Sequence, residues 1–167
     1  MKNQSNTTIT QPARPAVIRE TPEGSGPGRL EVNVIFTDPL ATVAALKAAG
    51  LLARDLGACI QVRAAIPVPY ALPLDKPPVS VGFLQNLLYR LICRSDLHTF
   101  EPSVHLYICR DQIEALVRVL RPNSLVVISG REHWWPTPER RIAEALRSKG
   151  HRVVFIGLKR GAKSDLR

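Results

Sequence analysis

The chain alternates between short runs rich in β-branched residues and longer segments whose apolar residues recur at helical spacing. Apolar runs of four to eight residues indicate strands, whereas a repeat of three to four residues indicates an amphipathic helix. This pattern predicts five strands. They are Glu31–Thr37, Cys59–Ile66, Val104–Cys109, Ser124–Ser129 and Arg152–Ile156.

A helix is predicted in each interval between these strands. The four helices are Leu40–Leu56, Val81–Cys93, Gln112–Leu120 and a last one from the N-cap Thr137 to Gly150. Ser80 and Asp111 are N-cap residues for the second and third, and Gly57 ends the first as a C′ glycine. Apolar faces are expected on the first two helices: Leu40, Ala44, Ala48, Leu51, Leu52 and Leu56, then Leu84, Leu87, Leu88 and Leu91.

Strands separated by helices imply right-handed crossovers and a parallel sheet covered on both faces. The predicted fold class is therefore α/β, an open, doubly wound, parallel five-stranded sheet in a three-layer, Rossmann-like arrangement. The one long connection, Pro67–Val79, contains five prolines. Because proline stiffens the backbone, this segment is expected to be an ordered lid.

The ends of the chain differ from its middle. Residues 1–29 lack apolar periodicity and predict a flexible leader, residues 30–158 form one domain, and residues 159–167 form a basic tail. The net charge of +9 is spread along the chain, which argues against specific nucleic-acid recognition. No apolar run is long enough to span a bilayer and no secretory signal is seen, so a cytoplasmic protein with buried, reduced cysteines is expected.

Ligands of open parallel sheets bind beyond the carboxyl ends of the strands. The loops expected there are 37–39, 65–67 and 129–133, and Arg131 and His133 in the last are suited to an anion. Asp38 has two interpretations, an N-cap or a ligand contact, and His133 is either an exposed loop residue or functional. The Trp134–Trp135 pair either stacks on a base, covers a partner or packs across the sheet end.

Motifs that would identify an enzyme are missing. The sequence has no GxxxxGK[ST] loop, no GxGxxG after a strand and no GxSxG elbow. The spacing of the histidines and cysteines predicts no metal site, and no catalytic residue is assigned.

Two segments resemble the universal stress protein family, within the adenine-nucleotide α-hydrolase-like folds. VIFTDPLATVAALKAAGLLARDLGACIQVRAAIPV looks like that family's first strand, Asp-containing turn, helix and second strand. DQIEALVRVLRPNSLVVISGRE looks like its third helix and fourth strand. The resemblance spans roughly residues 31–158 and implies a Rossmann-like fold and a role in stress responses.

Many members of that family bind ATP. The resemblance implies a site that includes Asp38, the segment around Val62 and Gly130. The loops at the strand ends add Thr37, Ile66, Ser129, Arg131 and His133 to the candidate site residues. The family's phosphate signature is glycine, two residues, glycine, nine residues, then glycine with Ser or Thr. Gly130 matches its first glycine, whereas His133 replaces the second and no Gly-Ser or Gly-Thr follows. Because glycine permits close backbone approach to phosphate, ATP binding in the family's manner is not expected.

Members without the signature are generally thought to act through dimers or partner proteins. The first hypothesis is therefore a non-catalytic regulatory or interaction module without a cofactor, forming a homodimer through Arg152–Leu158 and binding a protein partner. The alternative is a regulator that binds ATP or another adenine nucleotide through a non-standard phosphate loop. An enzyme of the α-hydrolase-like group and a non-specific polyanion binder are weaker hypotheses.

Overall fold

The structure is a computed structural model that describes residues 7–10, 29–97, 100–132 and 134–159. All five predicted strands form and lie parallel in the order β4-β3-β2-β5-β6. The order reverses at β2, as in a doubly wound sheet. These strands are β2 (Glu31–Ile35), β3 (Cys59–Pro67), β4 (Ser103–Cys109), β5 (Leu125–Arg131) and β6 (Arg152–Leu158).

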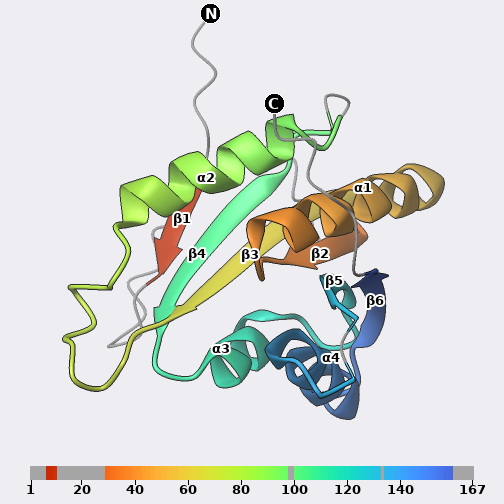
Figure 1. Ribbon diagram of the computed structural model, residues 1–167. Helices are drawn as coiled ribbons and strands as arrows, with labels where there is room; N and C mark the ends of the chain where they lie inside the picture. Colours follow the sequence, from red (N-terminus) through yellow and green to blue (C-terminus); the bar gives the residue numbers. More distant parts are fainter. Residues whose placement is uncertain (1–6, 11–28, 98–99, 133, 160–167) are drawn as a thin grey trace, which may run out of the picture.

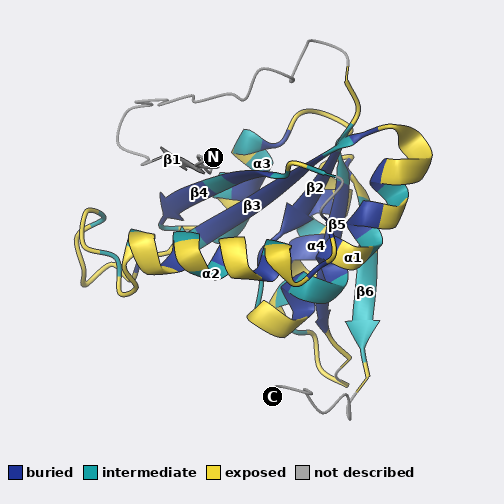
Figure 2. Ribbon diagram, turned by 90° about the horizontal axis from the view of Figure 1, so that it is seen from above, coloured by how far each residue is buried: buried dark blue, intermediate teal, exposed yellow. Residues whose placement is uncertain are grey.

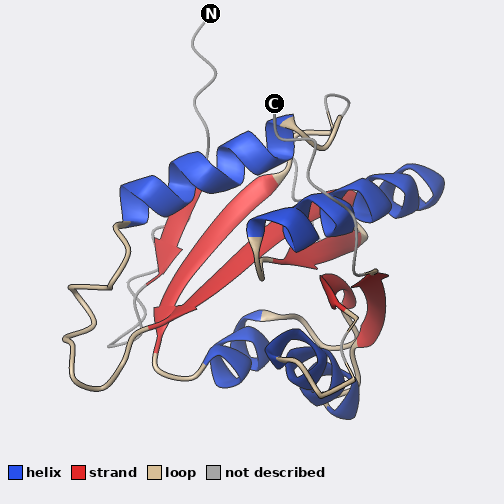
Figure 3. Cartoon of the chain, in the orientation of Figure 1, coloured by secondary structure: helices blue, strands red, loops and turns tan. Residues whose placement is uncertain are grey.

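Helices cover both faces of the sheet, which confirms the predicted three-layer fold. The four helices are α1 (Pro39–Leu56), α2 (Val81–Cys93), α3 (Gln112–Val119) and α4 (Pro138–Ser148). Helices α1 and α2 lie over one face and α3 and α4 over the other (Figures 1 and 3). The side chains of Ser80, Asp111 and Thr137 cap α2, α3 and α4 as predicted.

A further strand, β1 (Thr7–Thr10), pairs in parallel with the outer side of β4. The predicted flexible leader is therefore wrong for these four residues. Their sequence, TTIT, consists wholly of β-branched residues, which favour the extended backbone of a strand. Residues 1–6, 11–28 and 160–167 lie outside the described residues, so the predicted leader and tail are otherwise untested.

Helix α1 buries a different face from the one its leucines predict. Its buried positions are Ala41, Thr42, Ala45, Leu46, Ala49, Gly50 and Ala53, whereas Leu40, Leu51 and Leu56 are exposed. Small side chains let the helix lie close to the sheet. Helix α2 follows its prediction, since Leu84, Leu88 and Leu91 are buried. Gly57 ends α1 in the left-handed conformation with φ of 60°, as predicted.

The two faces of the sheet carry separate hydrophobic clusters. One lies under α1 and α2 and includes Val34, Val62 and Leu106; the other lies under α3 and α4 and includes Ile128 and Leu146. Figure 2 shows the central strands as buried and β6 as only partly buried. The core therefore fixes the central strands, and β6 is the less protected edge.

A buried polar cluster interrupts the α3 and α4 side. Arg63 on β3 donates from Nε to Asn33 Oδ1 at 2.6 Å and from Nη1 to the Tyr107 hydroxyl at 2.8 Å. Its Nη2 lies 4.0 Å from Glu31, which also pairs with Arg121 at 3.3 Å. Because a buried cation is costly unless it is paired and hydrogen-bonded, these partners permit an arginine in the sheet.

Candidate functional site

A pocket lies at the carboxyl ends of β2 and β3, where the topology predicts a ligand site. Its volume is about 260 Å³. Four segments form it: the end of β2, the end of β3, the start of α3 and the start of α4. The lining residues are Phe36, Thr37, Ala65, Ile66, Pro67, Gln112, Pro138, Glu139 and Ile142.

Thr37 ties the pocket to the neighbouring strand. Its hydroxyl donates to the carbonyl of Ser129 at 2.9 Å, and its backbone N–H donates to the Thr42 hydroxyl at 3.3 Å. The Ser129 hydroxyl in turn donates to the carbonyl of Ile156 at 2.9 Å. Thr37 thus lines the pocket, while Ser129 is fully buried beneath it as a link between β5 and β6.

Asp38 caps α1. Its Oδ1 accepts hydrogen bonds from the N–H groups of Leu40 and Ala41, both at 3.0 Å. Of its two interpretations, the structure supports the N-cap, and Asp38 does not line the pocket. Capping satisfies backbone donors that would otherwise be left without partners at the start of the helix.

The other predicted site residues lie apart from one another. Ile66 lines the pocket, whereas Val62 is fully buried in the core under α1 and α2. Gly130 is buried at the end of β5, and Arg131 is exposed. His133 lies outside the described residues. The structure therefore brings Thr37 and Ile66 together in the pocket and does not bring Val62, Gly130 or Arg131 to its walls.

The space beside Gly130 is filled by the first turn of α4. A Cβ atom at this position would lie 2.8 Å from Cβ of Glu139 and 3.2 Å from Cζ of Phe155. Only glycine fits there without a shift, because real Cβ atoms do not approach other carbons so closely. Gly130 therefore serves helix packing in this chain, and the room that glycine leaves is taken by protein atoms.

Gly157 on β6 shows the same arrangement. It pairs with Gly130 across the two strands, and a Cβ at Gly157 would overlap the side chain of Glu132. Two acidic side chains, Glu132 and Glu139, thus lie over the paired glycines at the carboxyl ends of β5 and β6. Carboxylates disfavour a phosphate at this position by like-charge repulsion.

Two residues that help to form the pocket, Gln112 and Glu139, were not among the predicted site residues. Gln112 begins α3 and donates from Nε2 to the carbonyl of Ala65 at 3.0 Å. Glu139 lies in the first turn of α4. The available signal was that both helices begin just after strand ends, so their first turns lie at the edge where ligands bind.

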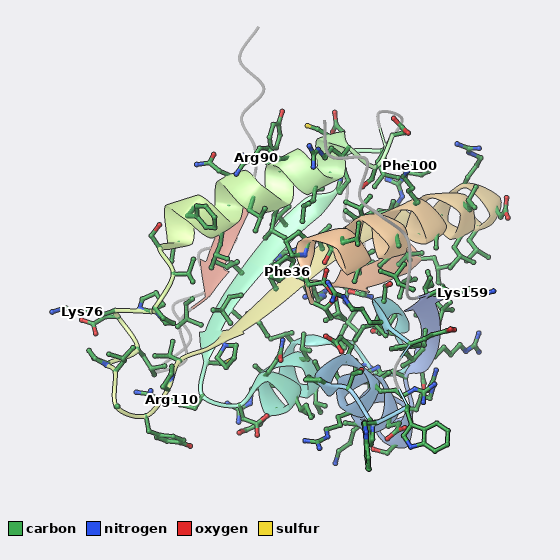
Figure 4. All side chains as sticks on the ribbon, viewed as in Figure 1. Phe36, Lys76, Arg90, Phe100, Arg110 and Lys159 are labelled. Atoms are coloured by element: carbon green, nitrogen blue, oxygen red, sulfur yellow. The ribbon has the colours of Figure 1, made fainter. Side chains whose placement is uncertain are left out.

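The proline-rich connection is held at its base by Arg110. Nη1 of Arg110 donates to the carbonyls of Val68 at 3.0 Å and Pro69 at 2.5 Å, and its guanidinium lies 5.2 Å from the centre of the Tyr70 ring. Figure 4 shows Arg110 at the base of this loop and Lys76 near its outer end. Residues 68–79 do not line the pocket, so the loop is ordered at its base without covering this site.

Trp134 and Trp135 lie in the connection between β5 and α4. These residues are 92% and 75% exposed, so they do not pack across the sheet end. Exposed tryptophans are uncommon because burial of the indole is strongly favourable. Stacking on a base and contact with a partner remain the two hypotheses for this pair.

The described part of the chain contains neither a membrane-spanning helix nor a metal-binding cluster. No helix there is long and apolar enough to cross a membrane. In the same ranges, no three His, Cys, Asp or Glu side chains gather closely enough to hold a metal ion. Cys109 is buried as expected, but Cys93 is exposed and Cys59 half-buried, so the prediction of three buried thiols is wrong for Cys93.

Comparison with known proteins gives a likeness in structure alone. No family model matches the chain, and no curated protein matches its sequence. Among solved structures, a universal stress protein from Archaeoglobus fulgidus superposes with a TM-score of 0.54 at 15% identity, covering 76% of this chain and 93% of that one.

A second solved structure, described as a universal stress protein in complex with cAMP, superposes with a TM-score of 0.51. It is also 15% identical and covers 76% of this chain and 95% of that one. At this identity the likeness concerns the fold. The chain therefore has the parallel five-stranded core and three-layer fold of universal stress proteins, as the sequence resemblance predicts.

Proposed function

We propose that this chain is a universal stress protein-like regulatory or interaction module that acts without catalysis, as a homodimer joined through β6. The proposal rests on β6, which is an edge strand with partly exposed apolar side chains. In the described part of the chain, β6 pairs with β5 on one side and with no strand on the other. Val154 is 38% exposed, and Val153, Phe155, Ile156 and Leu158 are half-buried.

An apolar edge strand of seven residues favours pairing with another strand. Two copies that pair β6 antiparallel to itself would be related by a two-fold axis, the commonest symmetry of soluble oligomers. Each β6 would then gain main-chain hydrogen bonds and cover for its half-exposed side chains. A protein partner would then bind to the surface of the dimer outside the β6 interface.

Light scattering coupled to size exclusion tests this proposal. We expect particles of twice the 18.5 kDa chain mass. Val154→Lys places a charge on the edge and should give monomers, since lysine on an edge strand opposes pairing. Leu51→Lys is the matched control, because Leu51 is 62% exposed and places the same charge on α1 and not on β6. A monomeric native chain, or equal effects of both variants, would contradict the homodimer.

The second candidate function is a nucleotide-binding regulator with a non-standard phosphate loop. It is supported by the pocket at the ends of β2 and β3, and by a solved structure of similar fold described as in complex with cAMP. Melting temperatures measured with ATP, ADP, AMP and cAMP test it. A saturable increase would support it, because a ligand that binds the native state selectively raises stability. No shift with any of the four nucleotides would argue against it.

A further inference from the structure

The pocket contains one charged side chain among the described residues that line it, that of Glu139. Glu139 is half-buried, and its carboxylate has no hydrogen-bond or ion-pair partner in the described part of the chain. The guanidinium of the neighbouring Arg140 forms no ion pair with Glu139 in the described residues and lies 6.0 Å from the centre of the Phe155 ring. The wall of the pocket therefore carries an unpaired negative charge.

The two neutral polar side chains of the pocket, Thr37 and Gln112, each donate one hydrogen bond to the protein, and the Gln112 amide keeps one further N–H. The Thr37 hydroxyl donates to the carbonyl of Ser129, and Nε2 of Gln112 donates to the carbonyl of Ala65. The hydroxyl oxygen of Thr37 keeps a lone pair, and the amide oxygen of Gln112 is also an acceptor. Together with Glu139, these groups favour a ligand that donates hydrogen bonds.

The helix starts around the pocket also disfavour an anion. Helices α1, α3 and α4 each have a carboxylate at the cap or in the first turn, from Asp38, Asp111 and Glu139. A carboxylate at a helix N-terminus offsets the partial positive charge that attracts phosphate groups. The carboxylates of Asp38 and Asp111 also accept hydrogen bonds from backbone N–H groups, which are then not available to bind an anion.

The volume of the pocket and its apolar walls limit the size and polarity of the remainder of the ligand. A pocket of about 260 Å³ lies below the range of roughly 300–1,000 Å³ that is usual for drug-sized ligands. Its walls include the apolar side chains of Phe36, Ile66 and Ile142. These walls fit a small apolar or aromatic group and leave little room for a triphosphate.

We propose that this pocket binds a small molecule with an apolar or aromatic body and a protonated amine, and that the amine pairs with Glu139. Glu139 is thus a specificity-determining residue that selects cations and rejects phosphate esters. The proposal concerns the pocket alone and does not depend on dimer formation through β6.

The test uses three compounds with one ring and different charges: benzylamine, benzyl alcohol and benzoate. Titration into the full-length, isotope-labelled protein is followed through the backbone amide signals of Thr37, Ile66 and Gln112. We expect benzylamine to shift these signals with a dissociation constant about tenfold below that of benzoate, the size of one charge-assisted hydrogen bond. AMP is titrated in parallel.

Glu139→Gln should abolish the preference for benzylamine while keeping the shape of the side chain. Glu132→Gln is the matched control, because it removes the same charge from a residue that lies over Gly157 and does not line the pocket. Benzoate binding as tightly as benzylamine, or no shift of the pocket signals by any ring compound, would overturn the proposal. Stronger binding of AMP would overturn it in favour of the nucleotide-binding function. Light scattering reports on the homodimer separately.

Discussion

Nη1 of Arg63 donates a hydrogen bond to the hydroxyl of Tyr107 at 2.8 Å, joining β3 to β4 on the face covered by α3 and α4. Both residues are buried, with 8% of each exposed. A hydrogen bond from a charged donor to a neutral hydroxyl is stronger inside the protein than in water. The central polar cluster is therefore expected to stabilise the sheet through its mutual contacts.

Arg63→Met removes the cation at the centre of this cluster. We expect it to lower the free energy of unfolding by about 3 kcal/mol, because Asn33 and Tyr107 lose a buried partner and Glu31 keeps only Arg121. Arg118→Met is the control. It breaks the exposed ion pair with Glu114 and should change the free energy of unfolding by less than about 1 kcal/mol. Urea denaturation measures both, and equal stabilities of the two variants would refute the role assigned to Arg63.

His105 makes stability depend on pH. Burial, and secondarily the charge of Arg63, lower the pKa of His105 from 6.5 to about 4. The unfolded chain binds this proton at a higher pH than the folded chain does. The contribution of neutral His105 to the free energy of unfolding is therefore fully present above pH 6.5 and is lost as the pH falls towards 4. The loss is up to about 3 kcal/mol by linkage.

His105→Gln tests this assignment, since glutamine does not titrate and can still reach Gln61, the present partner of the His105 ring at 2.7 Å. Urea denaturation from neutral to acidic pH should show a shallower decline than in the native chain. Some decline will remain, because burial also lowers the pKa of His151. An unchanged slope in the variant would rule out His105 as the main source.

Two glycine-to-alanine changes should have opposite effects. Gly130→Ala adds a Cβ 2.8 Å from Cβ of Glu139 and should destabilise the protein by about 1–3 kcal/mol through overpacking. Gly82→Ala adds a Cβ on α2 with no atom within 4 Å and should stabilise it by up to about 1 kcal/mol through helix propensity. Melting temperatures measure both effects. A neutral Gly130→Ala would mean that α4 is free to move away from β5.

The thiols should react at different rates. Cys93 is exposed, whereas Cys109 is buried and its pKa is raised to about 11, first by burial and then by Asp111. Because the thiolate is the reactive form, Cys93 should be modified by an aromatic disulfide reagent in the native protein and Cys109 only after unfolding. Cys93→Ser should remove the fast phase. A fast phase that survives this change would assign the reactivity to the half-buried Cys59.

The fold could be predicted from the sequence because the strands and most helices have distinct periodicities. Leu84, Leu88 and Leu91 of α2 are buried as their spacing indicates. The buried face of α1 was missed because this helix is apolar almost all round, so spacing alone did not orient it, and its small residues rather than its leucines meet the sheet. Strand β1 was missed because its four residues, TTIT, include only one apolar side chain and so lack the apolar run that marks the other strands.

The site was predicted in part. The switch in strand order placed a pocket at the ends of β2 and β3, and Thr37 and Ile66 do line it. That these residues bind a ligand remains a prediction. Gln112 and Glu139 were not identified, because their positions depend on how α3 and α4 cross the sheet. Sequence spacing cannot give that packing. In contrast, the sequence itself shows that residue 133 is histidine where the phosphate signature of universal stress proteins has its second glycine.

The two edges of the described sheet differ in length, and this bears on the size of the assembly that the proposed pairing of β6 would build. The edge formed by β1 has four residues, whereas β6 has seven. A head-to-tail contact of β6 with β1 would be short, and repeating it would build an open fibre. Pairing of β6 with itself uses the longer edge on both copies and leaves no second long edge in the described sheet. If β6 pairs with itself as proposed, growth should stop at two copies and light scattering should show no larger particles as the concentration rises.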